Sequence, residues 1–167
     1  MRPVTLIHVD SALQAILARG PEDFEARYHA TLGRQGELVR EVVRQSLAFF
    51  PSADDEPVWS GFLAVDEVSG TVVGSCAFKG PPSADGTVEI AYFTFPEFER
   101  SGFGTAMAAK LVEIALTANA VNAVIAHTLP ERNASTRILE KIGMRLLGEI
   151  LDPEDGTVWR WELSSGR

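Results

Sequence analysis

Residues 88–116 read VEIAYFTFPEFERSGFGTAMAAKLVEIAL, a strand pattern followed by a proline-bearing loop and a helix pattern. The first part is rich in β-branched and aromatic residues, which favour a strand over residues 87–95. In the second part, apolar residues recur at helical spacing and form one stripe that can pack against a sheet: Phe103, Met107, Leu111 and Ile114. The segment therefore predicts a strand, a tight loop and a helix that lies on the sheet.

Two glycines, Gly102 and Gly104, stand at the first turn of this helix, where glycine weakens helical structure. The first N–H groups of a helix have no partner within it and carry partial positive charge, so phosphate oxygens bind there well. Without Cβ atoms, the two glycines would let phosphate oxygens approach these N–H groups. A loop that needs unusual backbone dihedral angles explains the same pair, and the glycines alone leave that alternative open.

Two other phosphate-binding patterns do not fit this segment. The chain contains no G-x-x-x-x-G-K-[ST] sequence, which excludes a P-loop nucleotide hydrolase. The dinucleotide fingerprint needs a third small residue where Met107 stands, and the preceding strand does not open a βαβ unit.

The composition is typical of one folded domain. The chain has 167 residues, of which 46% are hydrophobic and 23% charged, enough for a continuous core. No apolar run approaches the roughly 20 residues of a membrane span, and the N-terminus lacks the pattern of a secretory signal. A single cysteine, Cys76, cannot form an internal disulfide, so we expect a cytoplasmic protein without a membrane partner.

The net charge of −8 argues against nucleic acid as a partner, because binding to its phosphate backbone needs clustered Lys and Arg. The acidic surplus can serve solubility alone, or it can surround a mouth that attracts a cationic amine. The three histidines are scattered without the spacing of metal ligands, so we expect no metal site.

The rest of the chain completes a mixed sheet. Before the quoted segment we expect a strand over 3–9, a helix over 11–19 with Ser11 as N-cap, a helix from Pro21, and a helix over 36–50 whose apolar face carries Leu38, Val42 and Phe49 or Phe50. Further strands are expected over 58–66, 71–79 and 123–128, a helix over 133–143, and a final hairpin over 144–163. This order predicts one α/β (α+β) domain over residues 1–167, with six or seven strands flanked by helices.

The quoted segment, followed by AVIAHTLPERNASTRILEKIGMRLLGE, resembles the GNAT superfamily of acyl-CoA-dependent N-acyltransferases. It looks most like the branch that contains ribosomal-protein alanine N-acetyltransferases, over about residues 58–163. The resemblance implies a sheet that splays apart beside strand 87–95, where the pantetheine arm of acetyl-CoA binds the exposed backbone like an added strand. By position, the resemblance implies that the pantetheine arm would bind Phe93, Thr94 and Phe95. The pyrophosphate would bind Arg100, Ser101, Gly102, Phe103, Gly104 and Thr105. The region near the thiol would lie against Asn133 and Ser135.

Two residues depart from the family pattern. The family motif usually has Gln or Arg three residues before the first glycine, where this chain has Glu99. The spacing from Asn133 to Ser135 is two residues, whereas three is common in this branch. The first departure favours Arg100 and the loop backbone as phosphate ligands, and the second displaces Asn133 by one position.

Acetyl transfer to an amine needs a base, because an acceptor ammonium with a pKa near ~10 must lose a proton before it attacks. We expect Glu89 to be this base, since it lies on the splayed strand and partial burial raises the pKa of a carboxyl. A glutamate that faces solvent or pairs with an arginine is the structural alternative. His127 ends a strand near the same place, as a second base or as ordinary strand-end packing.

The leaving thiolate needs little help, so a general acid is optional. Many relatives use a tyrosine of the late helix, but Tyr28 and Tyr92 lie elsewhere in the sequence, so Ser135, Thr136 or water would replace it. The N–H group of Phe93 is expected to polarise the thioester carbonyl.

The sequence thus predicts an N-acetyltransferase that uses acetyl-CoA and a primary amine in a ternary complex with direct attack. The acceptor, a small molecule or a protein N-terminus, would enter opposite the CoA arm, over the N-terminal helices and the final hairpin. An acyltransferase for a longer acyl-CoA and a catalytically silent acyl-CoA-binding or regulatory module are the alternatives. A homodimer through the hairpin that carries Trp159 and Trp161 is possible.

Overall fold

The computed structural model describes residues 2–51, 53–54 and 57–167. Within these residues the elements follow in the order β1 (Val4–His8), α1 (Ser11–Arg19), α2 (Pro21–Tyr28), α3 (Gly36–Phe49), β2 (Gly61–Asp66), β3 (Val72–Phe78), β4 (Thr87–Thr94), α4 (Phe103–Thr117), β5 (Ala123–Thr128), α5 (Ala134–Lys141), β6 (Arg145–Asp152) and β7 (Gly156–Ser164). The strands form one sheet in the order β1-β2-β3-β4-β5-β7-β6. Only β4 and β5 pair in parallel, so the predicted mixed sheet is confirmed.

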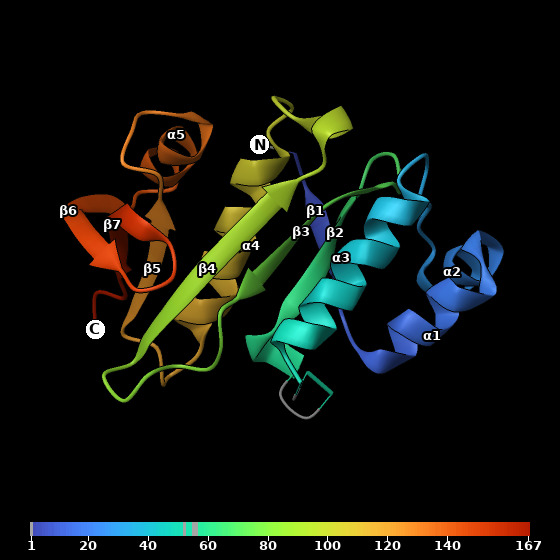
Figure 1. The fold of residues 1–167 in the computed structure, drawn as a ribbon, viewed down its shortest axis with the longest axis horizontal. Coiled ribbons are helices and arrows are strands. Elements are labelled where there is room, and N and C mark those ends of the chain that lie inside the picture. The colour runs from blue at the N-terminus through green and yellow to red at the C-terminus, as the bar shows by residue number, and fades with distance from the viewer. Residues whose placement is uncertain (1, 52, 55–56) are drawn as a thin grey trace.

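Helices cover both faces of the sheet (Figure 1). Helix α4 lies behind β4 and contributes Met107 and Leu111 to a core with Val88 and Ile90 of that strand. Helices α1, α2 and α3 cover the opposite face of the first strands, where Leu13, Phe24, Val39, Val43, Leu63 and Val72 form a second core. Among the described residues, no helix covers β5 to β7 on the α3 side (Figure 1).

Two local details differ from the sequence prediction. The N-cap of α1 is Asp10, whose carboxylate accepts a hydrogen bond from the Leu13 N–H at 2.8 Å, while Ser11 is the first helical residue. In α3 the buried residues are Val39 and Val43, one position after the predicted Leu38 and Val42. Leu38 and Val42 of the predicted apolar face are half-buried and pack beside the second core.

The sheet splays between β4 and β5, as predicted. Only three residue pairs join the two strands, and the last is Glu89 with Ile125. Beyond it, β4 continues along β3 as far as Thr94, while β5 continues along β7 as far as Thr128. The two strands diverge and leave a gap that opens toward the start of α4 (Figure 1).

The tryptophans of the hairpin are used inside the molecule. Trp161 is 1% exposed, and its indole N–H donates to the Thr128 hydroxyl at 3.1 Å. Trp159 packs on the same core. The large apolar side chains that the hairpin exposes are instead Leu146, Leu147 and Leu151 of β6, so the tryptophans give no support to a dimer.

Candidate functional site

The hydrogen bonds between β3 and β4 decide which backbone groups face the gap. The Lys79 N–H donates to the Glu89 carbonyl at 2.8 Å, and the Phe95 N–H donates to the Val73 carbonyl at 2.9 Å. Alternate residues of a strand direct their backbone groups to opposite neighbours, and the register between these two bonds is regular. Phe93, which lies between them at the same parity, therefore also directs its backbone to β3.

The free edge of β4 is consequently formed by Tyr92 and Thr94. The backbone groups of Phe95 have protein partners on both sides, because its carbonyl also accepts from the Phe98 N–H at 2.8 Å. Of the three residues expected to bind the pantetheine arm, the geometry favours Thr94 and argues against Phe93 and Phe95. The residue composition of a strand does not reveal which of its two parities faces a gap.

The loop before α4 leaves the helix end open. Arg100 and Gly102 both have a positive φ, of 60° and 86°. Helix α4 begins at Phe103, and the Ala106 N–H is bonded to the Gly102 carbonyl at 3.1 Å. The N–H groups of residues 103–105 precede this bond and have no acceptor within the helix. They form a positively polarised cradle of the kind that binds phosphate.

The two glycines of this loop serve different purposes. Gly102 occupies the left-handed region, and a Cβ there would meet only the Arg2 backbone nitrogen, at 3.9 Å. A Cβ on Gly104 would lie 2.7 Å from Ile138 Cδ1 of α5 and 3.3 Å from Thr94 Oγ1. Close packing between α4, α5 and β4 therefore explains Gly104, whereas the surface at Gly102 is open. Access for a ligand, expected of both glycines, fits Gly102 alone.

Arg2 is a cation near the loop that the sequence patterns did not point to. Its guanidinium lies 5.2 Å from the centroid of the Phe103 ring and 3.8 Å from the Asp66 carboxylate. Strand β1 carries it to the start of α4, about a hundred residues away in the sequence, so no local motif could have revealed it.

The start of α5 borders the gap on its other side. Asn133 is the N-cap of this helix: its side chain accepts from the Thr136 N–H, and its own N–H donates to the Thr136 hydroxyl, both at 3.0 Å. This reciprocal pair is a capping box, which commits the Asn133 side-chain oxygen to the helix end. Ser135 follows with its hydroxyl free of the cap.

Tyr92 bridges the gap to Ser135. The phenol oxygen lies 2.9 Å from Ser135 Oγ, although the two residues are 43 positions apart. Burial raises the pKa of the Tyr92 phenol, and the hydrogen bond with Ser135 partly opposes that shift. A tyrosine therefore does reach the late helix, from β4 rather than from the helix itself, which the sequence could not indicate.

Glu89 stands at the closed end of the gap and has two partners. Its Oε1 atom lies 2.8 Å from His127 Nδ1 and 3.1 Å from Lys79 Nζ. The other ring nitrogen of His127 is buried without a hydrogen-bond partner in the described part of the chain, so Nδ1 is the atom through which this ring bonds. Glu89 thus pairs with a lysine and a histidine, instead of the arginine considered from the sequence.

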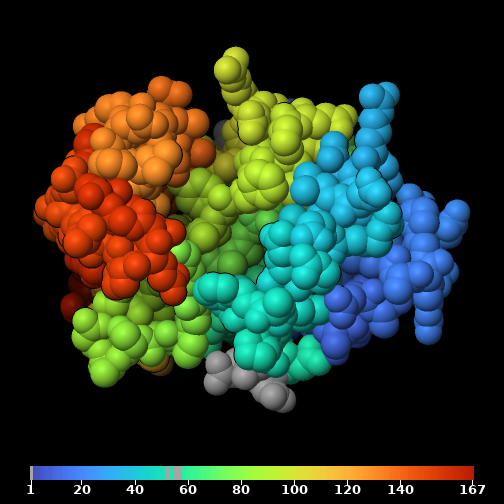
Figure 2. Space-filling model, viewed as in Figure 1, coloured from blue at the N-terminus to red at the C-terminus, as the bar shows by residue number. Residues whose placement is uncertain are grey.

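A groove of about 490 Å³ lies between α3 and the exposed face of β3 and β4. It is lined by Val9, Leu38, Glu41, Val42, Gln45, Ser46, Phe49, Phe50, Phe62, Ser75, Cys76, Ala77, Ala91, Tyr92 and Phe93. Figure 2 shows the molecule hollowed here, with the green sheet residues set back between the cyan α3 and the red hairpin. The predicted α3 stripe therefore lines a groove.

Cys76 and the scattered histidines add no further site. Burial raises the pKa of the Cys76 thiol, as expected for a small core residue rather than a nucleophile. Among the described residues no group of three or more His, Cys, Asp or Glu is arranged to hold a metal. No described helix is both long and apolar enough to cross a membrane.

Comparisons with known proteins agree on one family. The model of the acetyltransferase (GNAT) domain matches residues 1–145. The uncharacterized N-acetyltransferase YjdG of Bacillus subtilis (strain 168) is 28% identical over 88 residues, which are 53% of this chain and 52% of that protein. The match thus spans about half the length of this relative.

Solved structures resemble the whole fold. A spermidine N-acetyltransferase SpeG chimera from Vibrio cholerae and hSSAT superposes with a TM-score of 0.67 at 14% identity, covering 97% of this chain and 95% of that chain. The ribosomal-protein-S5-alanine acetyltransferase from Vibrio fischeri superposes with a TM-score of 0.65 at 13% identity, covering 98% and 92%. These two proteins have different acceptors by name, so the likeness identifies the fold and no particular branch.

Proposed function

The chain belongs to the GNAT acetyltransferase family, and from this premise we propose that it transfers an acetyl group from acetyl-CoA to a primary amine. The observation that carries the proposal is the gap beside β4, which runs from the closed end at Glu89 to the open helix end at residues 103–105. Along this path the edge of β4 offers backbone hydrogen bonds for the pantetheine arm, and the helix end offers N–H groups for the pyrophosphate.

The two sides of β4 take different substrates in this proposal. We call the free edge at Tyr92 and Thr94, the loop 100–105 and the start of α5 the cofactor side. We call the groove beneath α3, together with Glu89 two residues before the groove-lining Ala91, the acceptor side. The pantetheine arm would bind the edge of β4, while the pyrophosphate would bind the N–H groups of residues 100–105, with side-chain help from Arg100, Ser101 and Thr105.

On the acceptor side, Glu89 takes the proton of the ammonium, directly or through water. Lys79 and His127 fix the orientation of its carboxylate. The neutral amine then attacks the thioester carbonyl carbon, a C–N bond forms, the C–S bond breaks and the thiolate leaves. The N–H of Tyr92 or Thr94 replaces that of Phe93 as the donor that polarises the carbonyl oxygen, because these N–H groups face the gap.

On the cofactor side, Ser135 remains the candidate acid for the departing thiolate, now joined to the Tyr92 phenol at 2.9 Å. The pair can deliver one proton to the sulfur and recover one from solvent. Asn133 contributes through its backbone position, since its side chain caps α5.

The alternatives differ in how well they account for these residues. A silent acyl-CoA-binding module is not favoured, because such a module needs neither a positioned carboxylate nor an acceptor groove. A longer acyl donor and the ribosomal-protein branch stay open within the proposal, as do a homodimer and a cytoplasmic location.

The test is calorimetry with CoA, followed by release of free thiol from acetyl-CoA with a panel of amines. We expect CoA to bind and to raise the melting temperature, because a ligand that binds only the native state stabilises it. Thiol release should depend on the amine. No binding heat from CoA would remove the basis of the proposal, and release that is independent of any amine would leave only a thioesterase.

A further inference from the structure

The floor of the acceptor groove is made of small side chains. In the register of β3 and β4, Ala77 lies opposite Ala91 and Ser75 lies opposite Phe93. Alternate residues share one face of a sheet, so these residues lie on the same face as Glu89. The two alanines leave space between the sheet and α3, immediately beside the proposed base.

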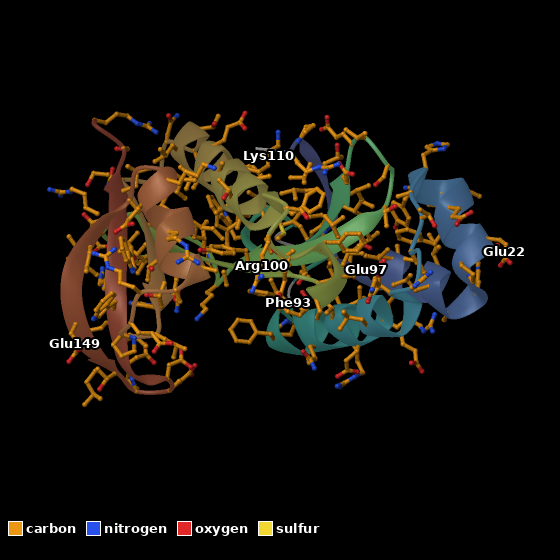
Figure 3. The ribbon with its side chains drawn as sticks, turned by 90° about the horizontal axis from the view of Figure 1, so that it is seen from above. Glu22, Phe93, Glu97, Arg100, Lys110 and Glu149 are labelled. Carbon is orange, nitrogen blue, oxygen red and sulfur yellow. The ribbon has the colours of Figure 1, made fainter. Side chains whose placement is uncertain are left out.

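Aromatic rings wall this space. Phe49 at the end of α3 is 61% exposed, and Phe93 on β4 is 44% exposed. Phe50 packs edge to face against Phe49 at 4.7 Å between ring centroids. Figure 3 shows the Phe93 ring projecting into open space beside α3. Exposed aromatic rings on both walls of a groove of about 490 Å³ are typical of a site that holds an apolar ligand.

The groove has one carboxylate along its length, and that carboxylate is already held by its neighbours on α3. Glu41 is the one charged residue among the described residues that line it. Its carboxylate accepts hydrogen bonds from Arg44 and Gln45, at 2.6 Å and 2.7 Å, and these bonds lower its pKa to about 2. A second ammonium group on the acceptor would therefore have to displace Arg44 and Gln45 from Glu41. The proposed base, Glu89, lies two residues from Ala91 on the same face of β4, with Lys79 and His127 as its partners.

We infer that the acceptor is a primary amine that carries an aromatic group a few bonds from its nitrogen and no second positive charge. The inference rests on the proposed transferase function. The ammonium would meet Glu89, and the ring would lie on Ala77 and Ala91 between Phe49 and Phe93. Ala91 is two residues from Glu89, about 7 Å along a strand, which suits a short linker between nitrogen and ring.

The experiment compares kcat/KM for phenethylamine and tryptamine with kcat/KM for ethylamine and spermidine, using acetyl-CoA and the full chain. We expect the aromatic amines to exceed ethylamine by about 10- to 100-fold, because burial of a ring is the added interaction. Spermidine should fall below both aromatic amines.

Two variants test the groove itself. Phe49→Ala removes an exposed wall, and Ala91→Leu fills the floor. Each should lower the ratio of kcat/KM for phenethylamine to that for ethylamine by about 10-fold. Ala84→Leu, on an exposed turn away from the groove, is the matched control and should leave the ratio unchanged. Thermal unfolding and the CoA dissociation constant check that the variants are folded.

Preference for spermidine, no release with either aromatic amine, or an unchanged ratio in both groove variants would overturn this inference. In each of these cases CoA still binds. Failure of the wild-type chain to bind CoA would instead overturn the proposed function.

Discussion

The two sides of β4 differ in what the strand contributes. On the cofactor side it presents backbone N–H and C=O groups at Tyr92 and Thr94, and the ligand is recognised by main-chain hydrogen bonds. On the acceptor side it presents the side chains of Glu89, Ala91 and Phe93, and the ligand is recognised by charge and shape. One strand can therefore keep its cofactor while substitutions at alternate positions change its acceptor.

The largest difference between the effects on the acceptor side and on the cofactor side is expected from Glu89→Gln. Loss of a general base typically costs 10²–10⁴-fold, so kcat should fall by about that factor while CoA affinity stays unchanged. Stopped assays of thiol release and calorimetry with CoA measure the two quantities. Glu131→Gln, at an exposed position, is the control. Wild-type turnover in Glu89→Gln would show that the proton leaves by another route.

A smaller effect, on CoA affinity rather than on kcat, is expected from Gly102→Val. The left-handed conformation costs a residue with a Cβ about 1–2 kcal/mol, so the free variant loop should relax to another conformation. Restoring the cradle on binding then costs that free energy, and CoA affinity should fall by roughly 5- to 30-fold. The affinity for the amine should change little. Gly70→Val, on the turn between β2 and β3, has the same kind of strain, with φ 70° and open space around it. Equal CoA affinity in the two variants would argue against the loop as the phosphate cradle.

The smallest effect is expected from Tyr92→Phe, which removes the hydrogen bond across the gap. One such bond is worth about 1 kcal/mol of unfolding free energy. Burial raises the folded-state pKa of Tyr92 above its unfolded value of about 10. The buried neutral phenol therefore makes its full contribution to stability below that pH. The contribution is lost as the pH rises through the folded pKa.

Urea unfolding at pH 8 and at pH 11 measures this difference. The stability advantage of the wild type over Tyr92→Phe should shrink at the higher pH. Tyr28→Phe removes a phenol whose pKa burial also raises but which has no bond to Ser135, so it gives the pH effect of burial alone. An advantage that is the same at both pH values would mean that the phenol does not report on the gap.

Local patterns predicted most of the fold. The strands, the helix after Gly102 and the splay beside β4 follow from apolar spacing, from β-branched residues and from the family resemblance. The sequence was less informative where two neighbouring residues can both cap a helix. Asp10 rather than Ser11 is the N-cap of α1, because its carboxylate accepts a hydrogen bond from the Leu13 N–H.

The partners of the site could not be predicted, because they meet only in three dimensions. Lys79 and His127 reach Glu89 from neighbouring strands, and Tyr92 reaches Ser135 across the gap. The register between β3 and β4 decides which residues of β4 direct their backbone groups to the gap. It places Tyr92 at the free edge, where Phe93 was predicted. The spacing on α3 predicted an apolar face, but an apolar groove and an apolar core have the same residue pattern, so the spacing alone did not show which of the two it forms.

The seam of three residue pairs between β4 and β5 gives the molecule two half-sheets with little main-chain connection between them. Helix α4 packs against strands of both halves and so fixes their relative position. Catalytic alignment and mechanical rigidity then depend on the same helix. Substitutions in α4 such as Met107→Ala, at a fully buried position, would loosen this packing and so change the distance between donor and acceptor.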